Sequence, residues 1–297
     1  MKGSVFALFR PAASLLSACD SMERCASCRD EGRLAVRSIA LQKVRNVRDL
    51  GGIAVEGGRV VAPGLFFRGA ALNEATPDDQ AVLFDELGIA CVIDVRCGWE
   101  REAKPDVEAP GVENLHIPFF DLEKVGVEYT EPAAGTKVVG RDVACDPLRF
   151  YGALSNVLTA AQMREAVHCA FSHALEGKPV YLHCSGGKDR AGVLSLLILA
   201  ILGADEEAVL ADYLLTNESR DRHYDQEYRR FLRFADGNEE LARKLTLAHR
   251  ANPENLQAFY DSLEARYGGM EAFIVEVLQV DRHYRACLKE QLTILAS

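Results

Sequence analysis

The sequence feature that most constrains the fold is a glycine-containing turn between two apolar segments. Lys178–His183 is a predicted strand. The apolar run Val193–Leu202 is too short to span a bilayer, so it predicts a core helix that starts near Gly192. The turn between them reads Cys184-Ser-Gly-Gly-Lys-Asp-Arg190. The chain therefore brings a cysteine and an arginine to the end of a buried strand.

Before Asp205, predicted strands alternate with predicted helices. Leu65–Gly69, Ile89–Val95 and Asn114–Phe119 are further strands, and 89–95 is apolar almost throughout, as in a strand buried on both faces. Predicted helices cover 76–87 and 160–175. This alternation predicts an α/β core.

Beyond Asp205 the pattern predicts helices only. Asn252 and Pro253 form a helix-start signal, and Gly268-Gly269 separates two helices. The segment 121–150 is rich in glycine, proline and charge and is predicted to be irregular. We expect residues 41–297 to form a single domain, with 205–297 as its helical subregion.

Residues 1–40 are predicted to be an N-terminal tail or leader. Leu16–Cys19 resembles a bacterial lipoprotein cleavage box, but Arg10 and Pro11 interrupt the apolar stretch before it. We therefore predict a cytoplasmic protein. Export, or lipid anchoring through Leu16–Cys19, is the alternative.

Nine cysteines are present, which is an odd number. Four of them fall within apolar or helical patterns, where a reduced cysteine behaves as a small hydrophobe: Cys91, Cys97, Cys169 and Cys287. This usage indicates a reducing compartment. Cys25 and Cys28 lack a second ligand pair at zinc-finger spacing, so no metal is predicted.

The formal net charge of -10 argues against nonspecific binding to nucleic acid or to anionic lipid. An anionic substrate therefore needs a locally positive pocket on this chain. No transmembrane segment is predicted.

The turn has the chemistry of such a pocket. Gly186 and Gly187 let the backbone curl so that successive N–H groups point into one hollow at a helix N-terminus. Arg190 can grip two phosphate oxygens with its planar guanidinium. The same electrostatics favour the thiolate of Cys184, which is the nucleophilic form. We predict that Cys184 attacks a bound phosphate monoester. The alternative is a buried cysteine in an ordinary turn. It does not explain the adjoining Lys-Asp-Arg sequence, because these charged residues have no role in packing a core turn.

His183–Gly192 resembles the signature loop H-C-x-x-G-K-D-R-[ST]-G of the bacterial atypical tyrosine phosphatases. The resemblance runs in order over residues 45–295 and includes Asn46–Gly52, Phe67–Gly69, Val92–Arg96 and Asp212–Asn217. It implies a mostly parallel sheet of four or five strands flanked by helices, with C-terminal helices acting as a partial lid. It also implies that Cys184 is the nucleophile and Arg190 the phosphate clamp, with no metal or organic cofactor.

The other loop residues are implied to bind substrate: Ser185, Gly186, Gly187, Lys188, Ala191 and Gly192. Lys188 and Asp189 are the pair that this family associates with broader specificity, including phosphoinositides. Ala191 departs from the pattern, which has Thr or Ser there. That hydroxyl helps the thiolate leave, so its absence predicts fast formation and slow hydrolysis of the phosphocysteine.

The leaving oxygen needs a proton, and three carboxylic acids are candidates to supply it. Asp189, inside the loop, is the first choice, as the resemblance suggests. Asp94, at the end of a buried strand, is the second, and Asp121 is the third. An ion pair of Asp94 with Arg48 or Arg68 is the alternative for that residue.

Several residues are candidates for supporting roles. His183 could hydrogen-bond to the backbone and so hold the loop in place. Arg48 and Arg68 could add positive potential around the pocket, or could form surface salt bridges of little effect. An apolar stripe could cover an aryl phosphate or could be core: Tyr224, Tyr228, Phe231 and Leu232.

Three functions remain open from the sequence. The first is a protein-tyrosine phosphatase, whose partner is a phosphotyrosine protein. The second is a phosphoinositide or broad-specificity phosphatase, which Lys188 and Asp189 favour. The third is a slow phosphate-binding pseudophosphatase, which Ala191 favours. No nucleic-acid partner and no integral membrane association are expected.

Overall fold

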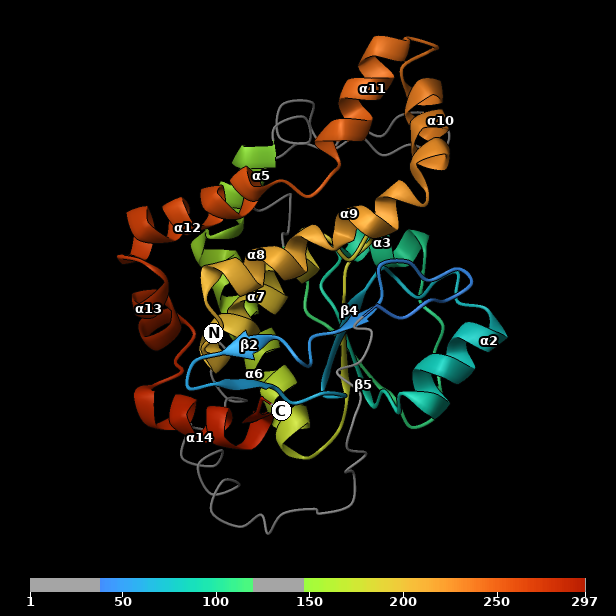
Figure 1. The fold of residues 1–297 in the computed structure, drawn as a ribbon. Helices are drawn as coiled ribbons and strands as arrows, with labels where there is room; N and C mark the ends of the chain where they lie inside the picture. The colour runs from blue at the N-terminus through green and yellow to red at the C-terminus, as the bar shows by residue number, and fades with distance from the viewer. Residues whose placement is uncertain (1–37, 120–146, 297) are drawn as a thin grey trace, which may run out of the picture.

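A computed structural model of the protein describes residues 38–119 and 147–296, with a five-stranded sheet at its centre (Figure 1). The strands are β1 Arg48–Asp49, β4 Phe66–Gly69, β5 Cys91–Asp94, β6 Glu113–His116 and β7 Val180–His183. Their order is β1-β4-β7-β5-β6, and only the edge strand β1 is antiparallel to its neighbour. The predicted α/β fold with a mostly parallel sheet is confirmed.

Helices cover both faces of this sheet. The helices of this part of the chain are α2 Pro77–Gln80 with its continuation η1 Ala81–Glu86, α3 Gly98–Ala103, α5 Pro147–Leu154, α6 Val157–Leu175 and α7 Arg190–Leu202. Side chains alternate along the strands, so Phe66 and Ile93 join an apolar cluster with α6 and α7. Phe67 and Val92 join a second cluster, which contains Leu83 of η1. The central strands are thus buried on both faces, as their apolar composition predicted.

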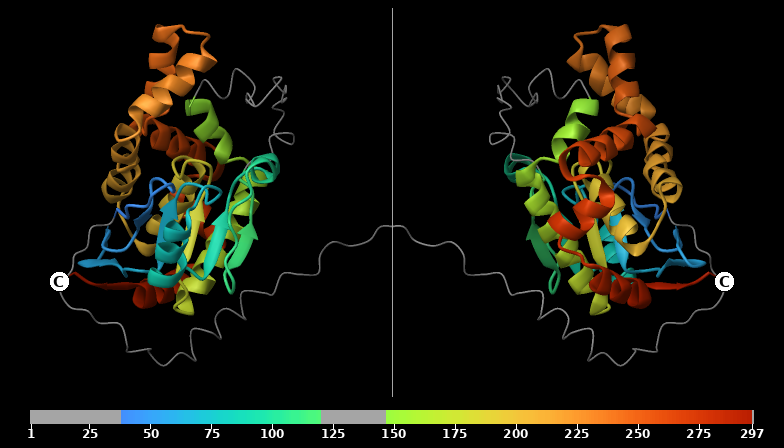
Figure 2. Two further views of the ribbon diagram at one scale, coloured as in Figure 1. Left: turned by 90° about the vertical axis from the view of Figure 1, so that its right-hand side faces the viewer. Right: turned by 90° about the vertical axis from the view of Figure 1, so that its left-hand side faces the viewer.

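The C-terminal part is helical apart from its last residues. Its helices are α8 Glu206–Leu214, α9 Thr216–Asp221, α10 Tyr224–Phe234, α11 Glu239–Ala248, α12 Pro253–Tyr267, α13 Met270–Ala272 with η2 Phe273–Val277, and α14 Arg282–Leu292. Helices α10 and α11 form a hairpin that projects from the rest of the molecule (Figures 1 and 2). Gly268 ends α12 in the left-handed conformation, at the boundary that the sequence predicted.

Two sequence predictions about secondary structure are wrong. Residues after Asp205 are not only helical, because β8 Thr293–Leu295 joins β2 Ala54–Val55 and β3 Arg59–Val61 in a small antiparallel sheet. A three-residue strand is too short for a periodic pattern, and its partner lies far away in sequence. Helix α5 also begins inside the segment predicted to be irregular.

Several predictions concern residues outside the described ranges, namely the tail up to residue 37, the Leu16–Cys19 segment and Asp121. Within the described ranges, no helix is long and apolar enough to cross a membrane. Among the residues that the structure describes, four cysteines are free thiols: Cys91, Cys97, Cys169 and Cys184. Cys287, which was expected to be reduced, is disulfide-bonded.

Candidate active site

The loop that carries the predicted chemistry lies at the carboxyl edge of the parallel sheet. Cys184 follows the last residue of β7, and Arg190 is the first residue of α7. The side chain of Cys184 is almost fully buried. In open α/β sheets, ligands bind at this edge of the strands. The fold therefore places the nucleophile and the helix N-terminus where the sequence predicted them.

Two side chains hold the loop backbone from outside. Nδ2 of Asn46 donates to the carbonyl oxygens of Gly186 at 3.2 Å and Gly187 at 3.1 Å. Nη2 of Arg68 donates to those of Gly187 at 2.8 Å and Lys188 at 3.0 Å. In a trans peptide the N–H points away from the carbonyl, so the N–H groups that follow these carbonyls turn to the other side of the loop. This arrangement supports an anion-binding nest at the start of α7.

Asp212 joins the two arginines that were expected to support the site. Its carboxylate binds Nη1 of Arg68 at 2.8 Å and Nε of Arg48 at 3.0 Å, and all three side chains are buried. Burial and the charge of Arg48 lower the pKa of Arg68 to about 10, although Asp212 acts in the opposite direction. Arg68 therefore stays charged at neutral pH. The two arginines are part of a buried network beneath the loop, and the surface salt bridges considered from the sequence are not formed.

Arg190 is bound by a carboxylate that the sequence did not indicate. Glu100, in α3, accepts hydrogen bonds from Nη1 of Arg190, from Nη2 at 2.9 Å and from Oγ of Ser185. Burial by itself raises the pKa of Glu100, but Arg190 and Ser185 outweigh it and lower the pKa to about 2. Glu100 is therefore charged at neutral pH and holds the guanidinium in place.

Asp94 lies in a buried ion pair behind the loop. Its carboxylate accepts hydrogen bonds from Nε of Arg96 at 2.9 Å and from Nη2 at 2.8 Å. Burial raises the pKa of Asp94, but the neighbouring His183 and Arg96 outweigh it, and the net pKa is lowered. The alternative of an ion pair is therefore present, although its partner is Arg96 and not Arg48 or Arg68.

His183 belongs to the same buried cluster. Its Nε2 lies 3.2 Å from Oδ2 of Asp106, and its Nδ1 lies 3.4 Å from the carbonyl oxygen of Cys184. Asp94, Asp106 and His183 are close enough together to surround a metal ion. However, the guanidinium of Arg96 binds both carboxylates, and it would repel a second cation. The cluster fits an orienting role for His183 better than a metal site.

Asp189 occupies the N-cap position of α7 without capping the helix. Its side chain makes no hydrogen bond to the N–H groups of the first turn. Instead, Oδ1 accepts a hydrogen bond from the Tyr151 hydroxyl at 2.7 Å and lies 3.3 Å from Nζ of Lys188. The Asp189 side chain is 32% exposed, so it is accessible to solvent although the residue belongs to the loop.

Lys188 connects the loop to the projecting hairpin. Its Nζ donates to the carbonyl oxygens of His249 at 2.9 Å and Arg250 at 3.4 Å, directly after α11 ends. The carbonyls at a helix C-terminus carry partial negative charge and attract a cation. The side chain that was expected to bind substrate is therefore engaged by the base of the α10–α11 hairpin.

Ala191 and Gly192 begin the buried part of α7. A Cβ atom on Gly192 would lie 3.0 Å from Nη2 of Arg68, so this glycine makes room for the side chain that holds the loop. Ala191 is fully buried and brings no hydroxyl to the site. Gly192 thus supports the loop indirectly, by leaving room for Arg68. The contact of Ala191 and Gly192 with substrate stays a prediction.

The apolar stripe on α10 has two environments. Phe231 is buried and packs against His249, with 4.6 Å between the ring centroids. Tyr224 is exposed and stacks on Tyr228. Part of the stripe is therefore the core of the hairpin.

A family model described as the tyrosine phosphatase family matches residues 39–294, which is most of the chain. The chain belongs to this family. It is a cysteine-based phosphatase, that is, a phosphoric monoester hydrolase, as the loop predicted. The resemblance to bacterial atypical tyrosine phosphatases is confirmed.

Two curated relatives of this phosphatase carry matching names. It is 27% identical over 251 residues to the "Putative tyrosine-protein phosphatase" of Cupriavidus necator, covering 82% of this chain and 85% of the relative. It is 27% identical over 190 residues to the triple specificity protein phosphatase PtpB of Mycobacterium tuberculosis, covering 59% of this chain and 67% of the relative. Among solved structures, P. aeruginosa TpbA matches with a TM-score of 0.30 and 16% identity, covering 56% of this chain and 78% of that one.

Sequence reasoning on this phosphatase missed several residues that touch the loop or its supports. They are Asn46, Glu100, Asp106, Tyr151 and Asp212. Asn46 and Asp212 lie inside segments that carried the family resemblance, but no role followed from that position. No sequence pattern indicated a role for Glu100, Asp106 or Tyr151, because each contacts the site only in the folded chain.

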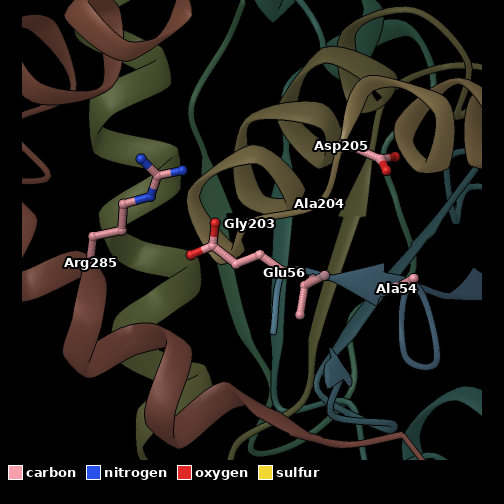
Figure 3. A pocket seen from close by; sticks show the side chains of 7 residues that line it. Ala54, Glu56, Gly203, Ala204, Asp205 and Arg285 are labelled. Carbon is pink, nitrogen blue, oxygen red and sulfur yellow. The ribbon is translucent and has the colours of Figure 1, made fainter. Parts of the chain in front are cut away.

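A separate hollow of about 370 Å³ lies at the opposite end of α7, where Gly203 ends the helix (Figure 3). Its charged lining is Glu56, Asp205 and Arg285. Glu56 binds Nζ of Lys289 at 2.5 Å, and Arg285 donates to carbonyls at the end of α7. None of the described loop residues lines this hollow, so we assign the chemistry to the loop.

Proposed function

We propose that this phosphatase hydrolyses phosphotyrosine in proteins. The Cys184 thiolate attacks phosphorus, and the P–O bond to the tyrosine oxygen breaks as that oxygen takes a proton from Asp189. Water then attacks the phosphocysteine, returns a proton to Asp189 and releases phosphate and the thiolate. The observation that carries this proposal is the placement of Cys184, Arg190 and Asp189 on one loop at the start of α7.

Asp189 is the better candidate for the acid. A general acid has to be protonated when the substrate binds and has to reach the leaving oxygen. The Asp94 carboxylate is buried and bound twice by Arg96, and its pKa is lowered, which favours the charged form. We propose that Asp94 instead fixes the end of β5.

Phosphoinositide hydrolysis is the second candidate function. The name of the M. tuberculosis relative states triple specificity, so a site of this family can accept more than one substrate class. The sequence argument for inositol phosphates was that Lys188 could bind a further ring phosphate. The hydrogen bonds of Lys188 to the end of α11 oppose that argument, since the ammonium would have to leave them first. We therefore favour phosphotyrosine.

Substrate preference tests the proposal directly. Hydrolysis of a phosphotyrosine peptide, a phosphoserine peptide and a soluble phosphoinositide should be measured as kcat/KM on the full chain. We expect the phosphotyrosine peptide to be preferred at least about 10-fold. Cys184→Ser should abolish all activity, whereas Cys169→Ser, a change to a free thiol in α6, should not. A higher kcat/KM for the phosphoinositide would overturn the assignment, and no hydrolysis of any substrate would favour a phosphate-binding module.

We also propose a cytoplasmic location. It rests on the free thiols Cys91, Cys97, Cys169 and Cys184, whereas the disulfide at Cys287 counts against it. Cell fractionation tests it, and recovery of the protein outside the cytoplasm would favour the Leu16–Cys19 alternative.

A further inference from the structure

A chain of three buried side chains leads to the carboxylate of Asp189. Nδ2 of Asn255 donates to Oη of Tyr213 at 3.0 Å, and Oη of Tyr213 lies 2.8 Å from Oη of Tyr151. The Tyr151 hydroxyl then donates to Oδ1 of Asp189 at 2.7 Å. The three residues come from α12, α8 and α5, and each is at most 2% exposed. We call these three residues the relay.

The Asn255 amide, at the end of the relay away from Asp189, fixes the direction of its hydrogen bonds. A side-chain amide nitrogen only donates, so the Tyr213 oxygen accepts from Asn255. The Tyr213 hydrogen is then available to the Tyr151 oxygen, and the Tyr151 hydrogen goes to Asp189. In this direction each of the two hydroxyls accepts one hydrogen bond and donates one, and the last donor points at Oδ1.

Both tyrosines remain donors over the pH range in which the enzyme works. Burial, together with the charge of Asp189, raises the pKa of Tyr151 well above its usual value. The same two causes raise the pKa of Tyr213. Neither phenol therefore gives up its proton to Asp189. The relay orients the carboxyl group and does not transport protons.

The position of Asp189 shows what the relay does to it. An aspartate at an N-cap ordinarily binds the N–H groups of the first helical turn. The Asp189 side chain makes no such bond, and Tyr151 holds it instead. Lys188 also approaches Oδ1, at 3.3 Å. The Tyr151 hydrogen bond therefore fixes the orientation of the Asp189 carboxyl group.

We propose that Tyr151, oriented by Tyr213 and Asn255, is a positioning residue for the general acid Asp189. The inference rests on the proposed function, in which Asp189 protonates the leaving oxygen. In that step the O–H bond of the Asp189 carboxyl group breaks and the leaving oxygen gains the proton while the S–P bond forms and the P–O bond breaks. The new carboxylate is stabilised by the hydrogen bond that Tyr151 donates to Oδ1.

The test is the leaving-group dependence of Tyr151→Phe. A badly oriented general acid slows hydrolysis most for a poor leaving group, because a poor leaving oxygen depends most on receiving a proton. We expect kcat/KM to fall about 10-fold to 100-fold with phenyl phosphate and less than about 2-fold with an activated aryl phosphate. The inhibition constant of inorganic phosphate should be unchanged, which shows that the phosphate pocket is intact. An equal loss with both substrates would overturn the proposal.

Two controls separate the relay from a packing effect. Tyr267→Phe removes another tyrosine hydroxyl near the end of α5, one that donates to the carbonyl of Ser155 at 2.8 Å. It should leave both substrates unaffected. In an Asp189→Asn background, Tyr151→Phe should cause no further loss with phenyl phosphate. A full additional loss there would overturn the proposal.

Asn255→Ala provides a second variant that keeps both tyrosines. It removes the donor that sets the direction, so we expect a smaller loss with the same leaving-group dependence. Unchanged kcat/KM with phenyl phosphate in both Asn255→Ala and Tyr151→Phe would overturn the relay while leaving the phosphatase assignment intact. Failure of the unmodified protein to hydrolyse either aryl phosphate would instead overturn the proposed function, and the relay with it.

Discussion

Glu100 binds both terminal nitrogens of Arg190, the guanidinium that we propose holds the substrate phosphate. A guanidinium carries five N–H donors in a fixed plane, so one edge can bind a carboxylate while other donors bind phosphate. This carboxylate comes from the short helix α3, which follows β5, whereas the loop connects β7 to α7. The phosphate site is therefore assembled from two connections at the same edge of the sheet.

Glu100→Gln should lower kcat/KM about 10-fold, mainly through a higher KM. The amide keeps the size of the side chain but loses the charge that orients Arg190. Steady-state kinetics with an aryl phosphate measure this effect. Unchanged or improved kcat/KM would show that Glu100 competes with the substrate for Arg190 and does not orient it.

The same carboxylate should make stability depend on pH. The pKa of Glu100 is lowered in the folded protein from its ordinary value of 4.5 to about 2. A lowered folded-state pKa stabilises the protein above the unfolded-state pKa, and this contribution is lost as pH falls toward 2. The shift corresponds to roughly 3 kcal/mol. Urea unfolding at pH 6 and pH 3 should show a smaller loss of stability on acidification for Glu100→Gln than for the unmodified protein.

The control for this pH effect is Glu240→Gln. Glu240 pairs with Lys244 on the exposed surface of α11, where solvent screens the interaction. It should leave the pH dependence unchanged. Equal pH dependence in Glu100→Gln and in the unmodified protein would contradict the assignment.

Asp212→Asn should destabilise the fold by about 3 kcal/mol. The carboxylate neutralises two buried arginines, and its loss leaves both charges without compensation. Asp221→Asn, which breaks the more exposed pair with Arg250, should cost less than about 1 kcal/mol. Denaturant unfolding of the two variants measures the difference, and equal costs would contradict the role given to Asp212.

Gly187→Ala should lower kcat/KM about 100-fold by distorting the loop. Gly187 has a φ of 65°, and a Cβ there would lie 2.3 Å from both the carbonyl carbon and oxygen of Gly69. Because the added atom meets backbone, the loop has to move, and a displacement near 1 Å costs about 100-fold in rate. Gly64→Ala has a similar φ of 79° but open space around the added atom, so it should affect stability only. Comparable kcat/KM for the two variants would contradict this account.

The sequence predicted the features that depend on local pattern. Strand β7, helix α7 and the loop between them follow from an apolar strand, two glycines and an apolar helix, and the structure has them in place. It did not predict Glu100 or Tyr151, because their contacts with Arg190 and Asp189 span 90 and 38 residues. The partner of Asp94 was predicted wrongly for a related reason. Arg48 and Arg68 are drawn to Asp212, which lies more than 140 residues away.

Ala191 provides the clearest kinetic prediction. The family resemblance implies that a hydroxyl at this position donates to the sulfur and helps the thiolate leave, so we expect its absence to slow the second step more than the first. Rapid mixing with an activated aryl phosphate should show a burst of phenol followed by slow turnover. Ala191→Thr should raise the turnover rate about 10-fold to 100-fold and reduce the burst, because a hydrogen bond to a charged sulfur contributes about 1.5–3 kcal/mol.

Ala191→Val is the matched control, since valine has the shape of threonine without the hydroxyl. The site is fully buried, so both variants pack additional atoms against the same neighbours. If Val raises turnover as much as Thr, packing and not hydrogen bonding limits the second step. If the unmodified protein shows no burst and Thr leaves turnover unchanged, hydrolysis of the phosphocysteine is not the slow step, and the alanine is compatible with ordinary phosphatase kinetics.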